Sequence, residues 1–502
     1  MVVLNGENLT LDNVVAVAMR EEPVSLAAGA IGNMRRSRAV VEALEAGEAP
    51  VYGVNTGVGL LAARRIEPAG LEQLQRNLVR SHACGVGEAL ETSVVRAMML
   101  IRANVLAKGL SGIRPVVAER LCMFLNRGVT PVVPSRGSVG ASGDLAPLAH
   151  IALVLIGEGE AGYQGQKIDG GEALLKAGID AVQLASKEGI SLINGTQAML
   201  AIGCLQLHAA RILADTADVV CALTTDSLHG TPRAFDPRAH QARPHPGQME
   251  SAAILFRLLR DSPIRESHLY CSRVQDAYAI RCAPQVHGAV RDALREAGRV
   301  FSIELNSATD NPLVLDGEIL SAGNFHGQPL ALQLDYLAVA LTALAGISER
   351  RIDRLVNPAL SEGLPPFLAR DPGLESGYMM PQVTAAALVA ENRVLATPAS
   401  PGSITTSGNK EDFVSMGMTA ALKFAQVVAN TRYVLAIEAL CAARALEWLR
   451  PLRTSPPLEQ VFESIRRAAP RPAADAPFTR SIEDMTREIA SGELARIVEA
   501  DV

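Results

Sequence analysis

The sequence predicts an all-α protein built around a bundle of unusually long central helices. Alanine and leucine are abundant and aromatic residues make up only 4% of the 502 residues, a composition that favours helices over sheets. Three segments contain a single interior glycine each, and each could form more than about seven helical turns: residues 196–226, 329–357 and 413–450. Such lengths indicate a helical bundle with long members.

A fourth long helix is predicted from Pro284 to Asn306. Its apolar residues follow helical spacing: Val286, Val290, Ala293, Leu294, Ala297, Val300 and Phe301. Helices of this length are not stable alone in water, so we expect them to bury their apolar faces against one another. Several are apolar around much of their circumference, which also favours association of several copies of the chain.

The links between these helices are short and rich in glycine, and they are candidates for the functional loops. One of them, "GSVGASGD" at 137–144, precedes a shorter helix expected from about Leu145 to Ile156. We expect Asp144 to cap this helix or to lie in its first turn, Pro147 to occupy the first turn, and Gly157 to end it.

Composition excludes several classes of function. The formal net charge is −6 and no basic stretch offers a face for phosphate groups, which argues against nucleic-acid binding. The N-terminal residues do not resemble a signal peptide, and the longest apolar runs, such as 337–347, are shorter than a membrane span. Seven scattered cysteines without a C-x-x-C pair favour a reduced, cytoplasmic location.

Two weak motifs are set aside. "GVGLLA" at 57–62 fits a loose dinucleotide-binding pattern, but no βαβ unit is predicted around it. His240 and His245 lie close together in sequence without acidic or thiolate partners at ligand spacing, so no metal site is expected.

The tripeptide Ala141-Ser142-Gly143 would by itself predict only a tight turn. However, Gly143 has no side chain, so its amide nitrogen can approach the carbonyl carbon of Ala141 and close a five-membered ring. Loss of two water molecules would then leave a methylidene group on an imidazolone, a strong electrophile that needs no external cofactor. Backbone N–H groups at the start of the next helix would favour negative charge on this group.

Eight segments in order along the chain share one resemblance: "YGVNTGVG", "NLVRSHACGVG", "GSVGASGDLAPLAH", "LINGTQ", "VQDAYAIRCAPQVHG", "NSATDNP", "GNFHGQP" and "NKEDFVSMG". Together they resemble the family of ammonia-lyases and aminomutases that build 4-methylidene-imidazole-5-one (MIO) from Ala-Ser-Gly. The resemblance covers essentially the whole chain. Ser81-His82 and Glu411 are most similar to the histidine branch, whereas Lys410 and Ala277 depart from its usual Gln and Pro.

The resemblance implies a helical architecture like that of the fumarase and aspartase superfamily, assembled as a homotetramer with active sites formed by loops of three subunits. It divides the chain into an N-terminal lobe with site loops at 1–110, the MIO loop and long bundle at 111–455, and a helical tail at 456–502. It implies no external cofactor and no metal, and a small amino acid as substrate.

The resemblance also implies roles at the reacting atoms. Ala141, Ser142 and Gly143 would become the electrophile that captures the substrate amine. Tyr52 would remove the β-proton, which requires a phenolate stabilised by nearby donors or positive dipoles because a free tyrosine has a pKa of about 10. Asn194 would hydrogen-bond the electrophile or its amine adduct, and Tyr278 would support the developing charge.

Further residues would bind the substrate. Arg281 would hold the carboxylate with its planar fork, and Gln275 would orient the substrate nearby. His82 and Glu411 would hold an imidazole ring, since a carboxylate accepts an imidazole N–H and a phenyl ring has no donor to offer. Phe325 would pack over the electrophile. Outside this context, each of these residues would have an ordinary structural explanation.

The implied reaction is elimination of ammonia from L-histidine to give trans-urocanate. A phenylalanine or tyrosine ammonia-lyase and an aminomutase remain alternatives on the same scaffold. An inactive helical oligomer that serves as a structural or binding protein is the alternative from another class.

Overall fold

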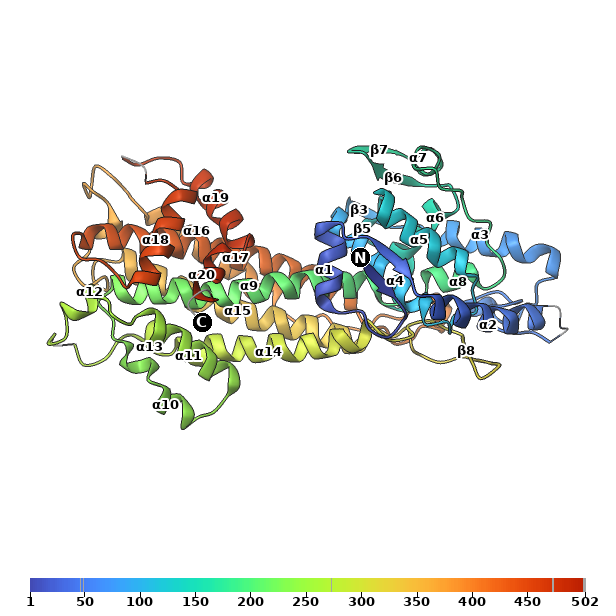
Figure 1. Ribbon diagram of the computed structural model, residues 1–502, viewed down its shortest axis with the longest axis horizontal. Helices are drawn as coiled ribbons and strands as arrows, with labels where there is room; N and C mark the ends of the chain where they lie inside the picture. Colours follow the sequence, from blue (N-terminus) through green and yellow to red (C-terminus); the bar gives the residue numbers. More distant parts are fainter. Residues whose placement is uncertain (46, 48, 272, 472–473, 500–502) are drawn as a thin grey trace. The chain divides into compact units, whose positions relative to one another are not determined.

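A computed structural model of the chain is mainly helical, with about 60% of residues in helices (Figure 1). It describes residues 1–45, 47, 49–271, 273–471 and 474–499. The predicted all-α class is confirmed, and the four long helices begin and end within four residues of the predicted positions.

The helices are α1 Leu11–Arg20, α2 Ala28–Glu45, α3 Leu71–His82, α4 Thr92–Ala107, α5 Pro115–Arg127, α6 Leu145–Leu155, α7 Gly170–Ala177, α8 Glu188–Ile193, α9 Gln197–Ser227, α10 Pro237–Gln241, α11 Pro246–Leu258, α12 Pro263–Glu266, α13 Tyr278–Arg281, α14 Ala283–Glu304, α15 Gln328–Val356, α16 Met379–Leu395, α17 Gly417–Leu449, α18 Pro456–Ala468, α19 Thr479–Ala490 and α20 Glu493–Glu499. Short 3-10 turns lie at Gly59–Leu61 (η1), Pro68–Gly70, Pro232–Phe235, Pro366–Leu368 and Ser407–Asn409 (η5).

The strands are short and form small sheets. Strands β1 (Val2–Leu4) and β2 (Val24–Leu26) pair in parallel, whereas the other pairings are antiparallel. The antiparallel sheets have the orders β3-β5, β4-β6-β7 and β8-β9, with bounds β3 Val86–Ala89, β4 Thr130–Pro131, β5 Pro134–Arg136, β6 Glu160–Tyr163, β7 Gln166–Asp169, β8 Leu313–Leu315 and β9 Glu318–Leu320. They connect helices and carry little of the core.

The chain divides into two compact units. Unit 1 comprises residues 1–205, 298–335 and 398–422, and unit 2 comprises residues 206–297, 336–397 and 423–502. Four of the five dividing points fall within α9, α14, α15 and α17, and the fifth lies between Thr397 and Pro398, after α16. The predicted divisions after residues 110 and 455 do not coincide with these points, and they stay a prediction.

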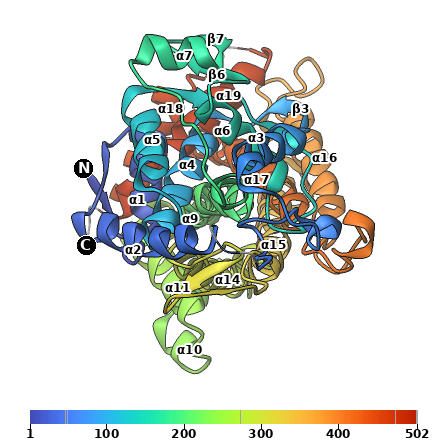
Figure 2. The same cartoon turned by 90° about the vertical axis from the view of Figure 1, so that its right-hand side faces the viewer.

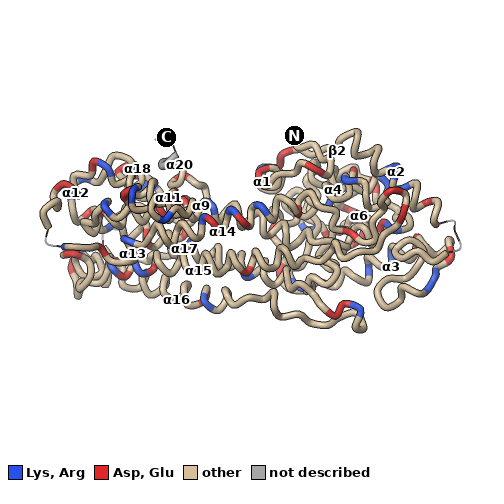
Figure 3. Tube along the Cα trace, turned by 90° about the horizontal axis from the view of Figure 1, so that it is seen from below, with Lys and Arg blue, Asp and Glu red and all other residues tan. Residues whose placement is uncertain are grey.

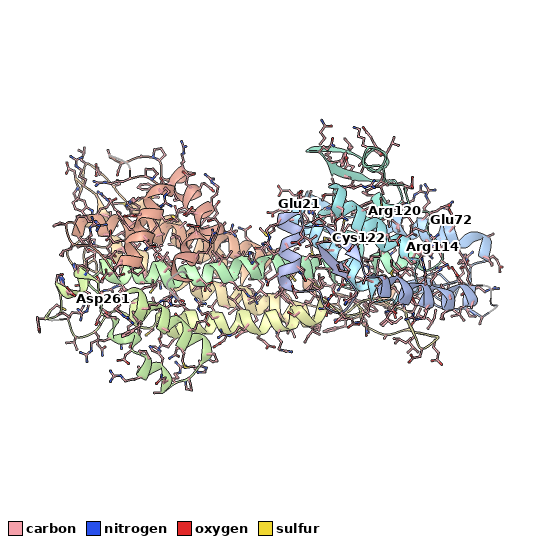
Figure 4. All side chains as sticks on the ribbon, viewed as in Figure 1. Glu21, Glu72, Arg114, Arg120, Cys122 and Asp261 are labelled. Carbon is pink, nitrogen blue, oxygen red and sulfur yellow. The ribbon has the colours of Figure 1, made fainter. Side chains whose placement is uncertain are left out.

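Helix α4 is the centre of unit 1. Its residues from Val94 to Ala107 are buried, and α1, α2 and α5 pack against it. At an edge of the same unit, the hairpin β6–β7 packs on α7, as both views show (Figures 1 and 2). Arg114, which is labelled in Figure 4 with Arg120 and Cys122, is the N-cap residue of α5. Its guanidinium pairs with the buried carboxylate of Glu188 at 2.6 Å. Most of the surface of α4 is therefore covered by other helices.

In unit 2, the segments of the four long helices lie side by side and share a buried polar network. Arg351 on α15 pairs through two nitrogens with Glu438 on α17, and its Nη1 lies 3.3 Å from Nε2 of His287 on α14. Nδ1 of His287 lies 2.7 Å from Oδ1 of Asp218 on α9, and Arg291 binds the other oxygen of Asp218 at 2.7 Å. One chain of contacts therefore joins all four helices.

Burial determines the protonation of this network. Burial lowers the pKa of His287, so the imidazole is neutral near pH 7 and its Nδ1–H is the donor to Asp218. Burial alone would raise the pKa of Asp218, but the hydrogen bond from His287 and the charge of Arg291 outweigh it and lower that pKa. The network thus contains paired charges and one neutral imidazole.

Two of the long helices are apolar enough to span a membrane by length and composition alone. They are α9 and α15, with 72% and 50% of their most apolar windows buried in the fold. The sequence analysis considered only uninterrupted apolar runs, which are shorter than these windows because the windows also include some polar residues. A core helix of a globular protein satisfies the same criterion, and the burial of α9 is typical of one.

Among the residues that the structure describes, acidic and basic residues are interspersed along the trace of both units (Figure 3). This distribution agrees with the small net charge of −6.

Replacing Arg351 by Met should lower the free energy of unfolding by about 3–5 kcal/mol, because it leaves the buried carboxylate of Glu438 without its cation. The neighbouring Arg350 is a matched control, since its side chain is 58% exposed and its pairing with Glu349 should contribute at most about 1 kcal/mol. Urea denaturation followed by far-UV circular dichroism measures both. Equal losses in R351M and R350M would contradict a stabilising role of the network.

Candidate functional site

The loop at 137–144 packs directly against the start of α9 in unit 1. Gly143 has a φ of +72° and forms an isolated bridge with Gly195, and its close approach leaves no room for a side chain. A Cβ added to Gly143 would lie 2.2 Å from the carbonyl oxygen of Gly195. Only glycine fits at position 143, because both the left-handed backbone and the contact exclude other residues.

Asp144 occupies the N-cap position of α6, in agreement with the expectation, but its side chain makes no capping hydrogen bond there. Instead, Oδ2 accepts the backbone N–H groups of Ala198 and Met199 at 2.9 Å each, so the carboxylate caps α9. Free N–H groups at a helix start attract an anion from any part of the fold, and α9 presents them in the direction of Asp144.

Burial raises the pKa of Asp144 to about 6, and the amides of Met199 and Ala198 and the Ser138 hydroxyl oppose this rise. The backbone N–H of Asp144 also donates to the Gly195 carbonyl at 2.7 Å. Backbone and side chain of one residue therefore tie the loop to two places near the start of α9.

The other end of the loop is held by the segment before α17. Ser415 Oγ donates to the carbonyl of Gly140 at 3.2 Å, and the N–H of Met416 donates to the carbonyl of Val139 at 2.9 Å. A Cβ added to Gly140 would lie 2.2 Å from Ser415 Oγ, so this contact also requires glycine. The loop is thus fixed on two sides, with Ala141 and Ser142 between the fixed points.

Ser142 and Glu411 are in direct contact. Ser142 Oγ donates to Oε1 of Glu411 at 3.0 Å, and the second carboxylate oxygen accepts Thr406 Oγ1 at 2.7 Å and Ser407 Oγ at 2.8 Å. Glu411 is half-buried, and the neighbouring Lys410 is exposed after the turn η5. The structure therefore brings the two sequence-predicted residues together, with Oε1 facing the electrophile position.

Tyr52 lies close enough to Glu411 to sense its charge. Burial raises the pKa of Tyr52, the hydrogen bond with the backbone of Gly59 lowers it, and the negative charge of Glu411 raises it further. The turn η1, which contains Gly59, packs on η5, which ends two residues before Glu411. Of these three effects, the Gly59 hydrogen bond favours the phenolate that a base role requires, and burial outweighs it.

Asn194 follows α8 as its C-cap and is buried. Its Nδ2 donates to the carbonyl of Asn311 at 2.9 Å, while Oδ1 is buried without a hydrogen-bond partner among the described residues. A buried acceptor without a donor is costly, and such an atom is suited to a donor from a bound molecule. Its neighbour Gly195 connects it to Gly143.

His82 and Phe325 belong to segments that touch this region. His82 ends α3, and its Nδ1 lies 2.8 Å from the carbonyl of Leu78, so only Nε2 is left for a substrate. A Cβ on Gly137 would lie 3.1 Å from the Cα of Gly85, which joins the segment after His82 to the loop. Phe325 is half-buried, two residues before Gly327, where a Cβ would lie 2.5 Å from Met199 Sδ.

Gln275, Tyr278 and Arg281 belong to unit 2, whereas the loop belongs to unit 1. Ala277, where the family usually has Pro, is the N-cap of α13, which carries Tyr278 and Arg281. The guanidinium of Arg281 lies 4.7 Å from the ring centre of Tyr278, and Tyr278 is 72% exposed while Gln275 is also exposed. Gln275 and Tyr278 are therefore exposed, whereas Arg281 is half-buried.

The residues present fit an MIO group. The glycine at 143 is sterically required, the loop is fixed on both sides of Ala141-Ser142-Gly143, and Asn194 Oδ1 offers an unused acceptor. The group would be held by its own backbone, with Glu411 in contact with Ser142, Ser138 Oγ 3.4 Å from the Gly143 carbonyl oxygen, and Asn194 next to Gly195, which contacts Gly143.

Sequence analysis missed Ser415 and Arg102 as parts of this site. Arg102 is fully buried in α4 and donates to the carbonyls of Asn194 and Ser191. The available signal was a single charged residue within the apolar stretch "MMLIRANVLA" of a predicted helix. A buried arginine needs several acceptors, and this requirement could have marked the position.

Comparison with known proteins agrees with this geometry. A family model described as aromatic amino acid lyase matches residues 9–467. A histidine ammonia-lyase from Koribacter versatilis is 58% identical, over 98% of both chains.

Solved structures agree as well. The crystal structure of histidine ammonia-lyase from Trypanosoma cruzi has a TM-score of 0.92 at 41% identity and covers 100% of this chain and 95% of that one. Tyrosine aminomutase from Streptomyces globisporus has a TM-score of 0.94 at 39% identity, covering 100% and 99%. The match extends over nearly the whole chain, and the chain therefore belongs to the aromatic amino acid lyase family.

Proposed function

We propose that this protein is a histidine ammonia-lyase, a carbon–nitrogen lyase that converts L-histidine into trans-urocanate and ammonia. The identity of 58% to a full-length relative of that name supports the proposal. The observation that carries it is the contact of Glu411 Oε1 with Ser142 Oγ at 3.0 Å.

This contact determines which ring the site accepts. When Ser142 loses its hydroxyl as water during formation of the electrophile, Oε1 of Glu411 loses its donor, while Oε2 keeps Thr406 and Ser407. An imidazole N–H of the substrate can replace the lost donor, and a phenyl ring cannot. Glu411 therefore favours histidine over phenylalanine, and His82 Nε2 is available to the same ring.

The chain's own residues prepare the remaining steps. MIO supplies an electrophile that turns the substrate amine into a leaving group. Tyr52 takes the β-proton on its phenolic oxygen, and Asn194 Oδ1 accepts an N–H at the amine end. Arg281 binds the substrate carboxylate, Gln275 orients the substrate, Tyr278 supports the developing charge, and Phe325 packs over the electrophile.

The complete site requires more than one copy of the chain. We propose a homotetramer whose sites combine loops of three subunits. Two observations support assembly: Tyr278 and Gln275 are exposed in the single chain, and α15 carries an apolar stripe of Leu332, Tyr336 and Val339, which are 52%, 49% and 46% exposed. Positions four and three residues apart lie on one helix face, so the stripe can pack against another helix.

The partners and location follow from the same proposal. The substrate is a small amino acid, no external cofactor or metal takes part, and neither nucleic acid nor a membrane is a partner. The seven cysteines are scattered along the sequence without a C-x-x-C pair, which supports a cytoplasmic location.

One alternative has a specific observation in its favour. Likeness to a tyrosine aminomutase, at a TM-score of 0.94, supports an aminomutase on this scaffold. The products distinguish the two: an aminomutase yields a β-amino acid, whereas a lyase yields a conjugated acid and free ammonia.

Ser142→Ala should abolish turnover while the fold is kept, because the methylidene carbon comes from this side chain. Intact mass gives the second measurement: the wild-type chain should be two water molecules lighter than its sequence, and the variant should not. Ser135→Ala, in β5 outside the loop, serves as the control and should keep both activity and the mass deficit. Turnover by S142A at the wild-type rate would refute the role, and a wild-type chain of full mass would favour an inactive scaffold.

Glu411→Gln should lower kcat/KM for L-histidine by roughly 10–150-fold, because a charged hydrogen bond of about 1.5–3 kcal/mol is lost. L-Histidine, L-phenylalanine and L-tyrosine are supplied separately, and urocanate, cinnamates, β-amino acids and ammonia are quantified. Asp412→Asn, an exposed neighbouring acid, is the matched control and should stay within about twofold of wild type. Preference of the wild-type enzyme for phenylalanine or tyrosine would contradict the assignment.

The pH dependence should reflect Tyr52. A base must be deprotonated, and both burial and the charge of Glu411 raise the pKa of Tyr52, so kcat/KM should increase with pH through the alkaline range. Glu411→Gln removes the negative charge and should move this rise to lower pH, measured on the residual activity. Tyr52→Phe should lose the activity, whereas Tyr163→Phe in β6 should leave the profile unchanged. An alkaline rise that moves to higher pH in E411Q would exclude Tyr52 as the titrating base.

A further inference from the structure

Gly195 lies between the loop and a cluster of buried polar groups formed by Arg102, Gln197 and Thr309. On one side, its carbonyl accepts the N–H of Asp144 at 2.7 Å and touches the backbone of Gly143. On the other side, a Cβ added to Gly195 would lie 2.6 Å from Nη1 of Arg102, 2.4 Å from Oε1 of Gln197 and 2.7 Å from the carbonyl oxygen of Thr309. Gly195 therefore cannot move away from Gly143 unless the residues of this polar cluster move as well.

Arg102 is the central residue of this polar cluster and donates hydrogen bonds to several acceptors. Its Nη1 donates to the Asn194 carbonyl at 3.0 Å and to Gln197 Oε1 at 3.1 Å, and its Nη2 donates to the Ser191 carbonyl. Gln197 is fixed in turn, because its Nε2 donates to Thr309 Oγ1 at 2.7 Å. The planar guanidinium thus joins the end of α8 to the start of α9, the two helices on either side of Gly195.

This arrangement is costly to bury. Arg102 is 1% exposed, and burial lowers its pKa to about 10, partly offset by the charge of Asp310. Its Nε has no hydrogen-bond partner among the described residues. A well-packed apolar side chain would often serve stability as well or better at such a place, so stability alone does not account for the arginine.

We propose that Arg102 is a positioning residue for formation of the MIO group: it holds Gly195 against Gly143 and so keeps the amide nitrogen of Gly143 close to the carbonyl carbon of Ala141. The inference rests on the proposed function, since it concerns the maturation of the same electrophile. It assigns this task to a residue on α4, far from the tripeptide in sequence.

The reaction that Arg102 would promote balances without an oxidant. A bond forms between the Gly143 nitrogen and the Ala141 carbonyl carbon. The Ala141 oxygen leaves as water with hydrogens from the amide nitrogens of Gly143 and Ser142, and the Ser142 hydroxyl leaves as a second water with the α-hydrogen of Ser142. The first bond depends on the approach of two backbone atoms, and a displacement of about 1 Å can slow such a step by roughly 100-fold.

Arg96 provides a matched control on the same helix. It is 2% exposed and donates to the backbone carbonyls of Val17 and Leu125, away from the loop. Removing Arg102 leaves Asp310 with Lys187, 3.5 Å away, so the buried carboxylate keeps a cation in the variant. Three variants are therefore compared: Arg102→Met, Arg102→Lys and Arg96→Met. They distinguish an effect specific to position 102 from the loss of stability expected when any buried arginine is removed.

The experiment follows the intact mass of the full-length chain from the time of synthesis, with circular dichroism as a check of folding. R102M should lose its two water molecules roughly tenfold or more slowly than wild type, and R102K should be intermediate because one ammonium cannot span both carbonyls. R96M should mature at the wild-type rate even if its midpoint of thermal unfolding is lower.

The outcomes are distinct. Maturation of R102M at the wild-type rate would overturn the inference, and so would equal slowing in R96M, which would indicate a general loss of stability. If R102M does not accumulate as folded protein, the rate of water loss is compared between R102K and R96M. Slower loss in R102K alone would support the inference, and equal rates would overturn it. A wild-type chain that keeps its full mass would overturn the proposed function itself, together with this inference.

Discussion

The carboxylate of Asp144 bound to the first N–H groups of α9 is the contact on which the arrangement of unit 1 depends. It brings the glycine-rich loop to the end of a buried helix, and the N–H of the same residue fixes Gly195 against Gly143. An anion at a helix start is stabilised by unsatisfied donors and by the helix dipole. Here this general preference connects two segments that are more than fifty residues apart in sequence and determines where Ser142 lies.

The pKa of Asp144, raised to about 6 by burial, measures the cost of this contact. The cost is tolerated because amide and hydroxyl donors surround the carboxylate, and because its removal would leave the start of α9 without an acceptor. Glycine at 140, 143 and 195 is the second condition. Each allows a neighbouring atom to approach closer than a Cβ would permit, so the loop can be compact without displacing the helices that hold it.

The sequence predicted the parts of the molecule that depend on local pattern. Long segments with few glycines and prolines, together with helical spacing of apolar residues, predicted α9, α14, α15 and α17 closely, because helical periodicity and helix breakers act over a few residues. The motifs also predicted that Ser142 and Glu411 belong to one site. The helix capped by Asp144 and the role of Arg102 could not be predicted in this way, because both depend on which distant N–H or carbonyl group the fold brings near the side chain.

The contact of Ser142 with Glu411 imposes an order on events in the site. While the serine hydroxyl is present, it occupies the carboxylate oxygen that the proposal assigns to the substrate ring, so precursor and substrate compete for one acceptor. In the proposed maturation, loss of the hydroxyl would create the electrophile and free that oxygen in the same step. Histidine recognition would then be coupled to maturation through one atom, because the precursor would have neither the group that activates the amine nor a free acceptor for the imidazole. On this proposal, the close packing of Gly143 against Gly195 would affect substrate recognition as well as the chemistry of the loop.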